Sequence, residues 1–436
     1  MPPASLEPHV VTVMQRHHLF FRVGQHIVHQ RAHHVPRIAR RQRRVVIRRF
    51  VEHDLVCHWR DRIVRRILTL MRGTGQQPVA DIRVGAIAPT GSPLWLVTNE
   101  PLVNQLVGYL DAMRHRIVDA PEEVHTFTFG RANLRDVRQA FARMIRHGEE
   151  KLHRVCELLC ETYLESPCTL QSVVIGEVET TKERFTLLMN LSPADLYSQT
   201  DLDLGSRQLR RLRYHDGSNW SRASLVSNVV EYQPSTPNKW GIHKFISRIK
   251  AEEQIWNKVA DSIFGIDRLV ESDKQLRHLG RFVKDVFGVK AIVGDAYQAR
   301  ALHDALHKLE WRADALERHR VPIQTSTTRL EFIEVKDYMA QFGRKATGWE
   351  AIKSVFRWWD STIEVQIQPL ANYHHERERL TRESHAGFKT RREELRNQIA
   401  ATIPLFGFYR DLLRWLFLCP EEPAPTFASV EIVLHE

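Results

Sequence analysis

Hydrophobic residues recur at steps of three, four or eight positions along residues 133–164. A helix with 3.6 residues per turn would carry these residues on one side: Leu134, Val137, Phe141, Met144, Leu152, Val155, Leu159 and Tyr163. This segment is therefore predicted to form a long amphipathic helix, and a similar pattern predicts a shorter helix over residues 94–117.

Two runs rich in apolar residues follow that helix. SVVIGEV (residues 172–178) and RFTLLMNL (residues 184–191) are predicted to pair as a hairpin. The stretch LGSRQLRRLRYHDGSNWSRAS (residues 204–224) is polar, and we interpret it as a linker.

Helical and strand patterns mix beyond residue 237. Helices are predicted over residues 242–263, 274–284, 297–311 and 373–403, and strands over residues 289–294, 330–335, 353–359 and 362–368. These elements predict an α/β unit of about 180 residues, a usual domain size. The chain accordingly divides into an N-terminal segment (1–92), a mainly helical region with a hairpin (93–235), an α/β domain (236–415) and a tail (416–436).

The composition is that of a globular protein that can bury a sizeable core, with 43% hydrophobic and 26% charged residues in a chain of 436. Its longest apolar run, residues 403–419, is interrupted by Arg410, Asp411 and Arg414. A bilayer span needs about 20 apolar residues, so this run predicts an amphipathic helix instead. The N-terminus shows no signal-peptide pattern, and five cysteines without a regular framework fit a reducing compartment. We therefore expect a cytoplasmic protein with no membrane segment.

The net charge of +11 is concentrated in the first part of the chain. Residues 1–150 hold 23 arginines, no lysine and 13 acidic residues, whereas residues 151–436 are almost balanced. Residues 1–75 alone hold 15 arginines and nine histidines. One interpretation is a basic arm that contacts nucleic acid. The other, which we favour, is that this segment is disordered or that the start codon was placed too far upstream.

Several familiar motifs are incomplete. GTGQQP at Gly73 lacks the third glycine of a dinucleotide-binding loop, and no GxxxxGK occurs. Cys156 and Cys160 share one predicted helix and are interpreted as packing residues, because no CxxC or HExxH accompanies them. The dipeptides at His53 and His215, each followed by aspartate, lack the partner ligands of a metal-dependent phosphohydrolase.

Two carboxylates in the α/β domain are the better candidates. Asp285 precedes the apolar run FGVKAIVG, and Gly288 would let a backbone approach closely. In TIEVQIQ the alternation places Ile363, Val365 and Ile367 on one face of a strand and Glu364, Gln366 and Gln368 on the other. The alternatives are a turn-capping role for Asp285 and a solvated sheet face for Glu364.

Basic residues surround these carboxylates in the predicted unit: Arg248, Lys250, Lys336, Arg344 and Lys345. Magnesium binds through one or two carboxylates together with substrate phosphates. Fixed positive charges stabilise a phosphoryl group in transfer. Trp349 offers a platform for a base, or else is a core residue beside Trp358 and Trp359. Together these features predict a magnesium-nucleotide site.

Four segments, in order, resemble the synthetase domain of the RelA/SpoT alarmone synthetase family. They are SRIKAEEQIW at Ser247, DVFGVK at Asp285, VKDYMAQFGRKATGWEAIK from Val335, and EVQIQ at Glu364. The family's counterparts are R-x-K, D-x-x-G-x-R, K-D-Y-I followed by P-K-P-N-G-Y-R-S-L-H, and E-[IV]-Q-I-R. The resemblance covers about residues 240–400.

The resemblance implies a nucleotidyltransferase-like mixed sheet flanked by helices. It also implies transfer of the β,γ-pyrophosphate of ATP to the 3′-hydroxyl of GDP or GTP. Asp285 and Glu364 would be catalytic and hold Mg²⁺, with Glu364 activating the hydroxyl. The other implied roles are ATP binding by Arg248, Lys250, Lys336 and Lys345, and acceptor binding by Trp349, Lys353 and Gln366.

The sequence departs from the family pattern around the acceptor. Glu350 stands where the family has arginine, Lys353 where it has histidine, and Lys290 where it has the last arginine of D-x-x-G-x-R. A glutamate repels phosphate, so an acceptor without a 5′-polyphosphate, such as a tRNA 3′ end, is an alternative. A nucleotide-binding module without catalysis is another. The sequence leaves the oligomeric state open.

Overall fold

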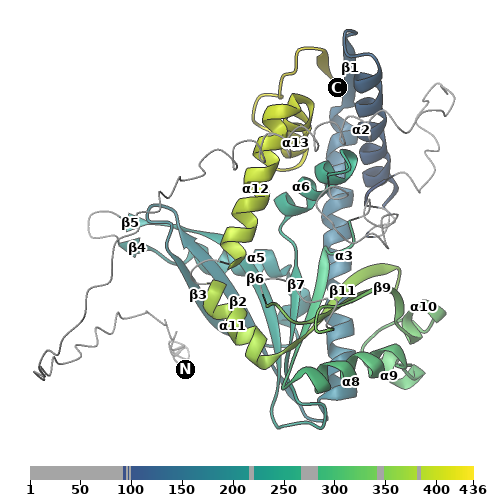
Figure 1. The fold of residues 1–436 in the computed structure, drawn as a ribbon, viewed down its shortest axis with the longest axis vertical. Helices are drawn as coiled ribbons and strands as arrows, with labels where there is room; N and C mark the ends of the chain where they lie inside the picture. The colour runs from purple at the N-terminus through teal and green to yellow at the C-terminus, as the bar shows by residue number, and fades with distance from the viewer. Residues whose placement is uncertain are drawn as a thin grey trace, which may run out of the picture.

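The computed structural model describes residues 92–94, 97, 100–215, 220–266, 283–340, 348–380 and 384–436, without the side chains of residues 377–392. An eight-stranded sheet forms its centre, and a group of helices lies beyond one end of that sheet (Figure 1). The predicted α/β class, a mixed sheet flanked by helices, is confirmed.

The sheet contains strands from both halves of the described chain. In spatial order they are β3 (Arg184–Leu191), β2 (Cys168–Val178), β6 (Ala223–Pro234), β7 (Ile242–Ile249), β8 (Phe287–Val293), β11 (Ser361–Pro369), β10 (Ile352–Trp358) and β9 (Glu331–Asp337). Among the described strands of this sheet, β8 and β11 pair in parallel and every other neighbouring pair is antiparallel. The predicted hairpin is confirmed as β2 and β3, and the four predicted C-terminal strands as β8 to β11.

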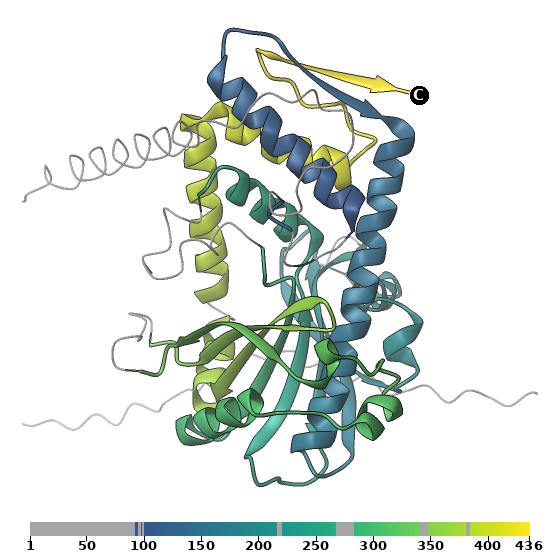
Figure 2. The same cartoon turned by 90° about the vertical axis from the view of Figure 1, so that its right-hand side faces the viewer.

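One face of the sheet is covered by the long helix α3 (Arg131–Tyr163), which continues well past the sheet (Figure 2). The ring of Phe287 on β8 lies where a side chain at Gly148 would be, 2.0 Å from an ideal Cβ there, so helix and strand pack closely only without one. Helices α8 (Ala296–His307) and α5 (Asp201–Arg210) contact other strands. Short helices α4 (Asp195–Ser198), α9 (Ala313–Arg318) and α10 (Thr325–Thr328) lie in connections.

The helices beyond the sheet form a second part of the same hydrophobic core. They are α2 (Pro101–Asp119), α6 (Glu252–Ile263), α12 (Ser384–Thr402) and α13 (Pro404–Phe417), with the N-terminal half of α3. Trp256 on α6 stacks on Phe417 with ring centroids 3.6 Å apart. Strand β12 (Val430–His435), within the predicted tail, pairs in parallel with β1 (His125–Gly130). None of the described helices has the length and apolar character required to cross a membrane.

The helix predicted over residues 242–263 is wrong in its first part. Strand β7 occupies residues 242–249, and only α6 is helical. The apolar residues Ile242, Phe245, Ile246 and Ile249 have helical spacing, but the same spacing also suits a strand buried on both faces, as β7 is.

The other predicted segments had mixed outcomes. The linker predicted at residues 204–224 is wrong, because it contains most of α5, whose Leu204 and Leu209 are buried, and strands β4 (Tyr214–His215) and β5 (Trp220–Ser221). The helix predicted over residues 373–403 corresponds to two helices, α11 (Leu370–Leu380) and α12. The helix predicted at 274–284 lies largely outside the described residues. The division at residue 235, which stays a prediction, falls between two adjacent strands of one sheet.

Candidate functional site

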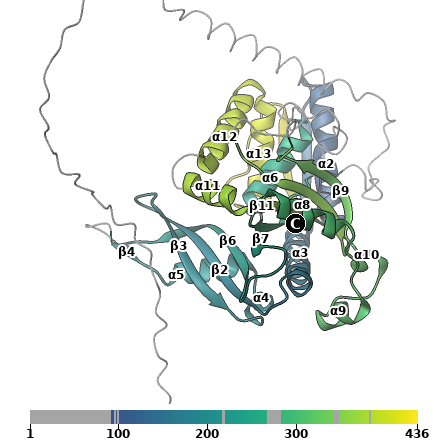
Figure 3. The ribbon, with the colours of Figure 1, turned by 60° about the horizontal axis from the view of Figure 1, so that its bottom comes forward.

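Three strands place their polar residues side by side on the face opposite α3. In the register of β7, β8 and β11, Arg248, Gly288 and Glu364 form one row, and Lys290 and Gln366 lie in the next. Paired residues of neighbouring strands project to the same face. Lys353 on β10 is opposite Gln366 and joins this second row. We call this surface the polar face; α11 contacts it through β8 and β11, and Figure 3 shows α11 on the side of the sheet away from α3.

Glu364 is buried on the polar face, with 2% of its surface exposed, so it is not a solvated sheet residue. Its Oε2 contacts the ammonium of Lys353, and its Oε1 accepts a hydrogen bond from Gln366 Nε2 at 2.7 Å. Arg248 Nη2 is 3.7 Å from Oε1. Burial raises the pKa of the Glu364 carboxyl, but Lys353 and Arg248 outweigh burial and lower it overall. Glu364 is therefore ionised at neutral pH.

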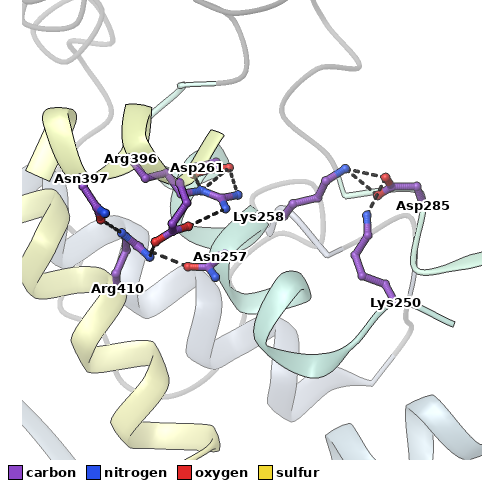
Figure 4. Close-up of polar contacts among 9 residues, drawn as sticks. Lys250, Asn257, Lys258, Asp261, Asp285, Arg396, Asn397 and Arg410 are labelled. Carbon is purple, nitrogen blue, oxygen red and sulfur yellow. Dashed lines mark hydrogen bonds and ion pairs between the residues drawn. The ribbon is translucent and has the colours of Figure 1, made fainter. Parts of the chain in front are cut away.

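Asp285 lies just before β8 and is bound by two lysines (Figure 4). Its carboxylate is 2.6 Å from Lys250 Nζ and 2.6–2.7 Å from Lys258 Nζ. Burial raises the pKa of Asp285, but Lys258, Lys250 and Lys353 together hold it well below its usual range. Because Lys353 acts on both carboxylates, Asp285 and Glu364 belong to one group.

This group, which we call the charged cluster, consists of two carboxylates and four basic side chains: Asp285, Glu364, Arg248, Lys250, Lys258 and Lys353. Burial lowers the pKa of Lys250 well below its usual range, but even with Lys250 neutral the cations outnumber the carboxylates. The cluster opens to solvent at Arg248, whose side chain is 44% exposed. A partly buried surplus of positive charge favours binding of an anion.

Gly288 keeps the floor of this cluster clear. A Cβ built there would lie 3.5 Å from the carbonyl oxygen of Glu364 and 3.9 Å from Nε of Arg248, which are ordinary contacts. Packing therefore does not require a glycine at position 288, and the predicted close approach of a backbone does not explain why glycine occurs there. A larger side chain would instead project between the Arg248 guanidinium and Glu364.

A second polar group lies next to the charged cluster. Glu376 on α11 pairs with Lys290 at 3.1 Å and accepts hydrogen bonds from Gln368 at 2.9 Å and from Trp349 Nε1 at 3.4 Å. The half-buried Trp349 ring packs edge-on against Tyr338, with centroids 5.3 Å apart. Trp349 is thus placed on the polar side of the sheet rather than with the buried Trp358.

Of the residues predicted to form the site, six come together: Arg248, Lys250, Asp285, Lys353, Glu364 and Gln366. Lys336 is one strand away and pairs with Glu334 at 3.0 Å. Lys345 lies outside the described residues. Arg248, in the segment matched to the family's R-x-K, lies near the end of β7 rather than in the predicted helix, and Lys250 directly follows that strand.

Lys258 was not predicted, although it contacts both oxygens of Asp285. It comes from α6, where Asp261, about one turn further along the helix, forms a buried ion pair with Arg396 of α12 at 2.6 Å (Figure 4). Its only signal in the sequence is a lysine within the mostly apolar pattern of residues 255–263. The fixed position of α6 therefore sets the position of one cation of the charged cluster.

The charged cluster suits Mg²⁺ in its donor chemistry. Asp285 and Glu364 are ionised carboxylates, and carboxylate oxygens are the ligands that Mg²⁺ prefers. Each carboxylate contacts at least one lysine ammonium, so a metal ion would need those lysines to move to another anion. This arrangement suits an Mg²⁺ ion that binds together with a nucleotide, whose phosphates would take up the lysines.

A second set of side chains has the spacing of a metal site, and no phosphate ligand is needed to complete it. Glu149, His153 and Asp201 place one ligand atom each within 4.8 Å of the others, and all three are buried. They lie on the α3 side of the sheet. The sequence signal that was missed is a glutamate and a histidine four residues apart on a predicted helix.

Neither protein-family models nor curated proteins match the chain. Among solved structures, it is similar to the small alarmone synthetase 1 from Bacillus subtilis, in a crystal structure with its product pppGpp bound. The identity is 14%, the match covers 38% of this chain and 81% of that chain, and the TM-score is 0.20. A likeness at this level carries no argument about function, and the family stays a prediction.

Proposed function

We propose that the protein is a magnesium-dependent pyrophosphotransferase that moves the β,γ-pyrophosphate of ATP to the 3′-hydroxyl of a guanine nucleotide. The observation that carries this proposal is the charged cluster, in which two ionised carboxylates and a surplus of cations meet at the polar face, beside the end of β7 and the start of β8. The motif resemblance at Asp285 and Glu364 supports this type of reaction. It also supports a nucleotidyltransferase-like fold.

The surplus cations would bind the triphosphate. Arg248 is the most exposed of them and presents a planar fork of donors, which suits two phosphate oxygens at once. Lys250, Lys258 and Lys353 each contact a carboxylate, and their ammonium groups can turn to phosphate oxygens when ATP binds. Charge aimed at the transferring group stabilises its transition state.

The two carboxylates would bind the metal ion and activate the attacking hydroxyl. Asp285 and Glu364 would hold Mg²⁺, which neutralises phosphate charge when bound. Glu364 is ionised, so it can accept the proton of the attacking 3′-hydroxyl. The 3′-oxygen forms a bond to the β-phosphorus, the bond from that phosphorus to the α,β-bridging oxygen breaks, and AMP leaves with that oxygen.

The acceptor would lie beside the second polar group. Trp349 is half-buried, is held by Glu376 and packs against Tyr338, so it can present a ring to a base. Such a stack contributes about 1–3 kcal/mol. Glu350, which follows it, would disfavour a 5′-polyphosphate, and a tRNA 3′ end is therefore kept as a test acceptor.

The Lys353–Glu364 ion pair favours a second candidate function, a module that binds nucleotide without transfer. A lysine that stays on Glu364 would prevent that carboxylate from accepting a proton. The two candidates differ in turnover and share nucleotide binding.

The experiment that separates them follows γ-labelled ATP on thin layers with GDP, GTP or bulk tRNA. Glu364→Gln removes the charge at nearly equal volume. Glu334→Gln is the matched control, because Glu334 is also a buried glutamate on the polar face paired with two lysines, two strands away. We expect label to move to a guanine nucleotide with the wild type and the control but not with Glu364→Gln. Binding of ATP without transfer in all three would sink the enzymatic proposal.

A further inference from the structure

We propose that Glu149, His153 and Asp201 form a buried site for one divalent transition-metal ion of the zinc class. This site is separate from the charged cluster and from the Mg²⁺ that the proposed function needs. We refer to these three residues as the triad.

The triad joins two helices. Glu149 and His153 are one turn apart on α3, and Asp201 is the first residue of α5. His153 Nε2 lies 3.4 Å from Asp201 Oδ1 and 3.9 Å from Glu149 Oε1. Ligands bound tetrahedrally at about 2.0–2.1 Å from zinc are about 3.3 Å from one another. The observed distances are therefore close to those of a metal centre.

Two buried atoms of the triad, His153 Nε2 and Asp201 Oδ2, form no hydrogen bond, although Nε2 lies at ion-pair distance from Asp201 Oδ1. Buried polar atoms are rarely left unpaired, because each costs about 1–3 kcal/mol. A metal bound by His153 Nε2 and by the Asp201 carboxylate would give both groups a partner.

Hydrogen bonds from neighbouring residues orient the triad, as they commonly orient metal ligands. His153 Nδ1 is 2.7 Å from the Tyr232 hydroxyl, so Nδ1 can donate to it while Nε2 faces the two carboxylates. Asn228 donates to the Asp201 carbonyl at 2.6 Å and accepts from Ser172 at 2.8 Å. The backbone N–H of Asp201 donates to Glu149 Oε1 at 2.5 Å.

The charge balance also points to a cation. Glu149, His153 and Asp201 expose 3%, 0% and 2% of their surface, and no lysine or arginine of the described residues forms an ion pair with either carboxylate. Burying two carboxylates without a permanent cation is costly. A divalent ion would neutralise them. A nitrogen ligand beside carboxylates favours zinc-class metals over Mg²⁺, which prefers oxygen ligands alone.

The first test measures zinc content after dialysis against a weak chelator. Asp201→Asn keeps the side-chain volume and removes a charged ligand. The control is His125→Gln, because His125 is another buried histidine, on β1, with one hydrogen bond to a backbone carbonyl. We expect one more zinc ion per chain in the wild type and the control than in Asp201→Asn. Zinc held by the nine histidines of residues 1–75 cancels in this difference.

The second test needs no variant and so does not depend on whether Asp201→Asn folds. Metal-free wild-type protein is titrated with Zn²⁺ or Co²⁺, while thermal unfolding and the visible absorption of Co²⁺ are recorded. We expect a higher Tm with Zn²⁺ and intense Co²⁺ bands, as at a site of low coordination number. Equal zinc in wild type and Asp201→Asn, or an unchanged Tm without such bands, would overturn the proposal. In that case a proton on His153, and not a metal ion, would balance the charge of the two carboxylates. Neither readout depends on pyrophosphate transfer.

Discussion

Two groups of buried carboxylates flank the central sheet, and they are neutralised in opposite ways. In the charged cluster, Asp285 and Glu364 are surrounded by four basic side chains. In the triad, Glu149 and Asp201 share a single histidine, and no lysine or arginine of the described chain pairs with them. The first group therefore has surplus positive charge and the second has surplus negative charge.

This difference indicates what each group would bind. A surplus of cations attracts an anion such as a polyphosphate, and a surplus of carboxylates attracts a metal cation. Access differs as well, because Arg248 is 44% exposed whereas the triad is closed to solvent. The charged cluster suits a ligand that enters and leaves, and the triad suits an ion that stays with the fold.

The largest expected effect comes from removing the carboxylate that two lysines share. Asp285→Ala leaves Lys250 and Lys258 without that partner, and breaking a buried ion pair costs about 3–5 kcal/mol. Tripolyphosphate should restore part of this loss, because an anion takes the place of the carboxylate. Denaturant unfolding with and without tripolyphosphate measures both effects.

The control is Glu177→Ala, which removes one partner of the more exposed Arg184 pair and should cost about 0.2–1 kcal/mol. If tripolyphosphate stabilises Asp285→Ala no more than it stabilises the wild type, the charged cluster is a structural ion-pair network and the comparison with the triad fails.

A smaller effect is expected on nucleotide affinity. Lys353→Met keeps most of the side-chain volume and removes a charged donor that would reach phosphate. A hydrogen bond to a charged group contributes about 1.5–3 kcal/mol, so the Kd for a non-hydrolysable ATP analogue should rise about 10–150-fold. Calorimetric titration measures it. Arg184→Met, on the edge strand β3, should leave the Kd unchanged; equal losses in both variants would mean that only overall charge matters.

Local patterns in the sequence were sufficient for much of this architecture. The helical spacing of residues 133–164 predicted α3, and the alternation around Glu364 predicted which residues share the polar face. These features depend on neighbours within a few residues. Strand β7 was missed because Ile242, Phe245, Ile246 and Ile249 have a spacing that fits a helix as well as a doubly buried strand.

Contacts between distant segments could not be predicted in the same way. Lys258 meets Asp285 across 27 residues, and Glu149 meets Asp201 across 52. Each contact depends on where a helix docks, which no local pattern specifies. The linker interpretation of residues 204–224 failed for the same reason, because α5 is fixed by its buried face against β6.

Acid should weaken the charged cluster only at low pH. Folding lowers the pKa values of Asp285 and Glu364 from unfolded values of about 3.9 and 4.3. Their contribution to stability is fully present above those values and is lost as the pH falls through the folded ones. Lys353 behaves oppositely, because folding raises its pKa. Its contribution to stability is fully present below about pH 10.4, the unfolded pKa, and is lost as the pH rises through the folded pKa.

The measurement is the free energy of unfolding of the wild type and Asp285→Asn between pH 3 and pH 9. Their difference should shrink below about pH 4, where the carboxylate of the unfolded wild type takes up protons. A difference that stayed the same between pH 5 and pH 3 would mean that folding does not lower the pKa of Asp285.

The smallest expected effect is that of Mg²⁺ alone, and it distinguishes the two groups most directly. Mg²⁺ without nucleotide should leave the Tm unchanged, because lysines contact Asp285 and Glu364 and the cluster repels a further cation. At a tenth of its Kd an ion adds less than about 0.1 kcal/mol. Adding an ATP analogue should make Mg²⁺ stabilising, since phosphates draw the lysines away from the carboxylates. Zn²⁺, in contrast, should act on the triad without any nucleotide. If Mg²⁺ alone raised the Tm of the wild type but not of Glu364→Gln, the charged cluster would already be a cation site, and its surplus of positive charge would not decide what it binds.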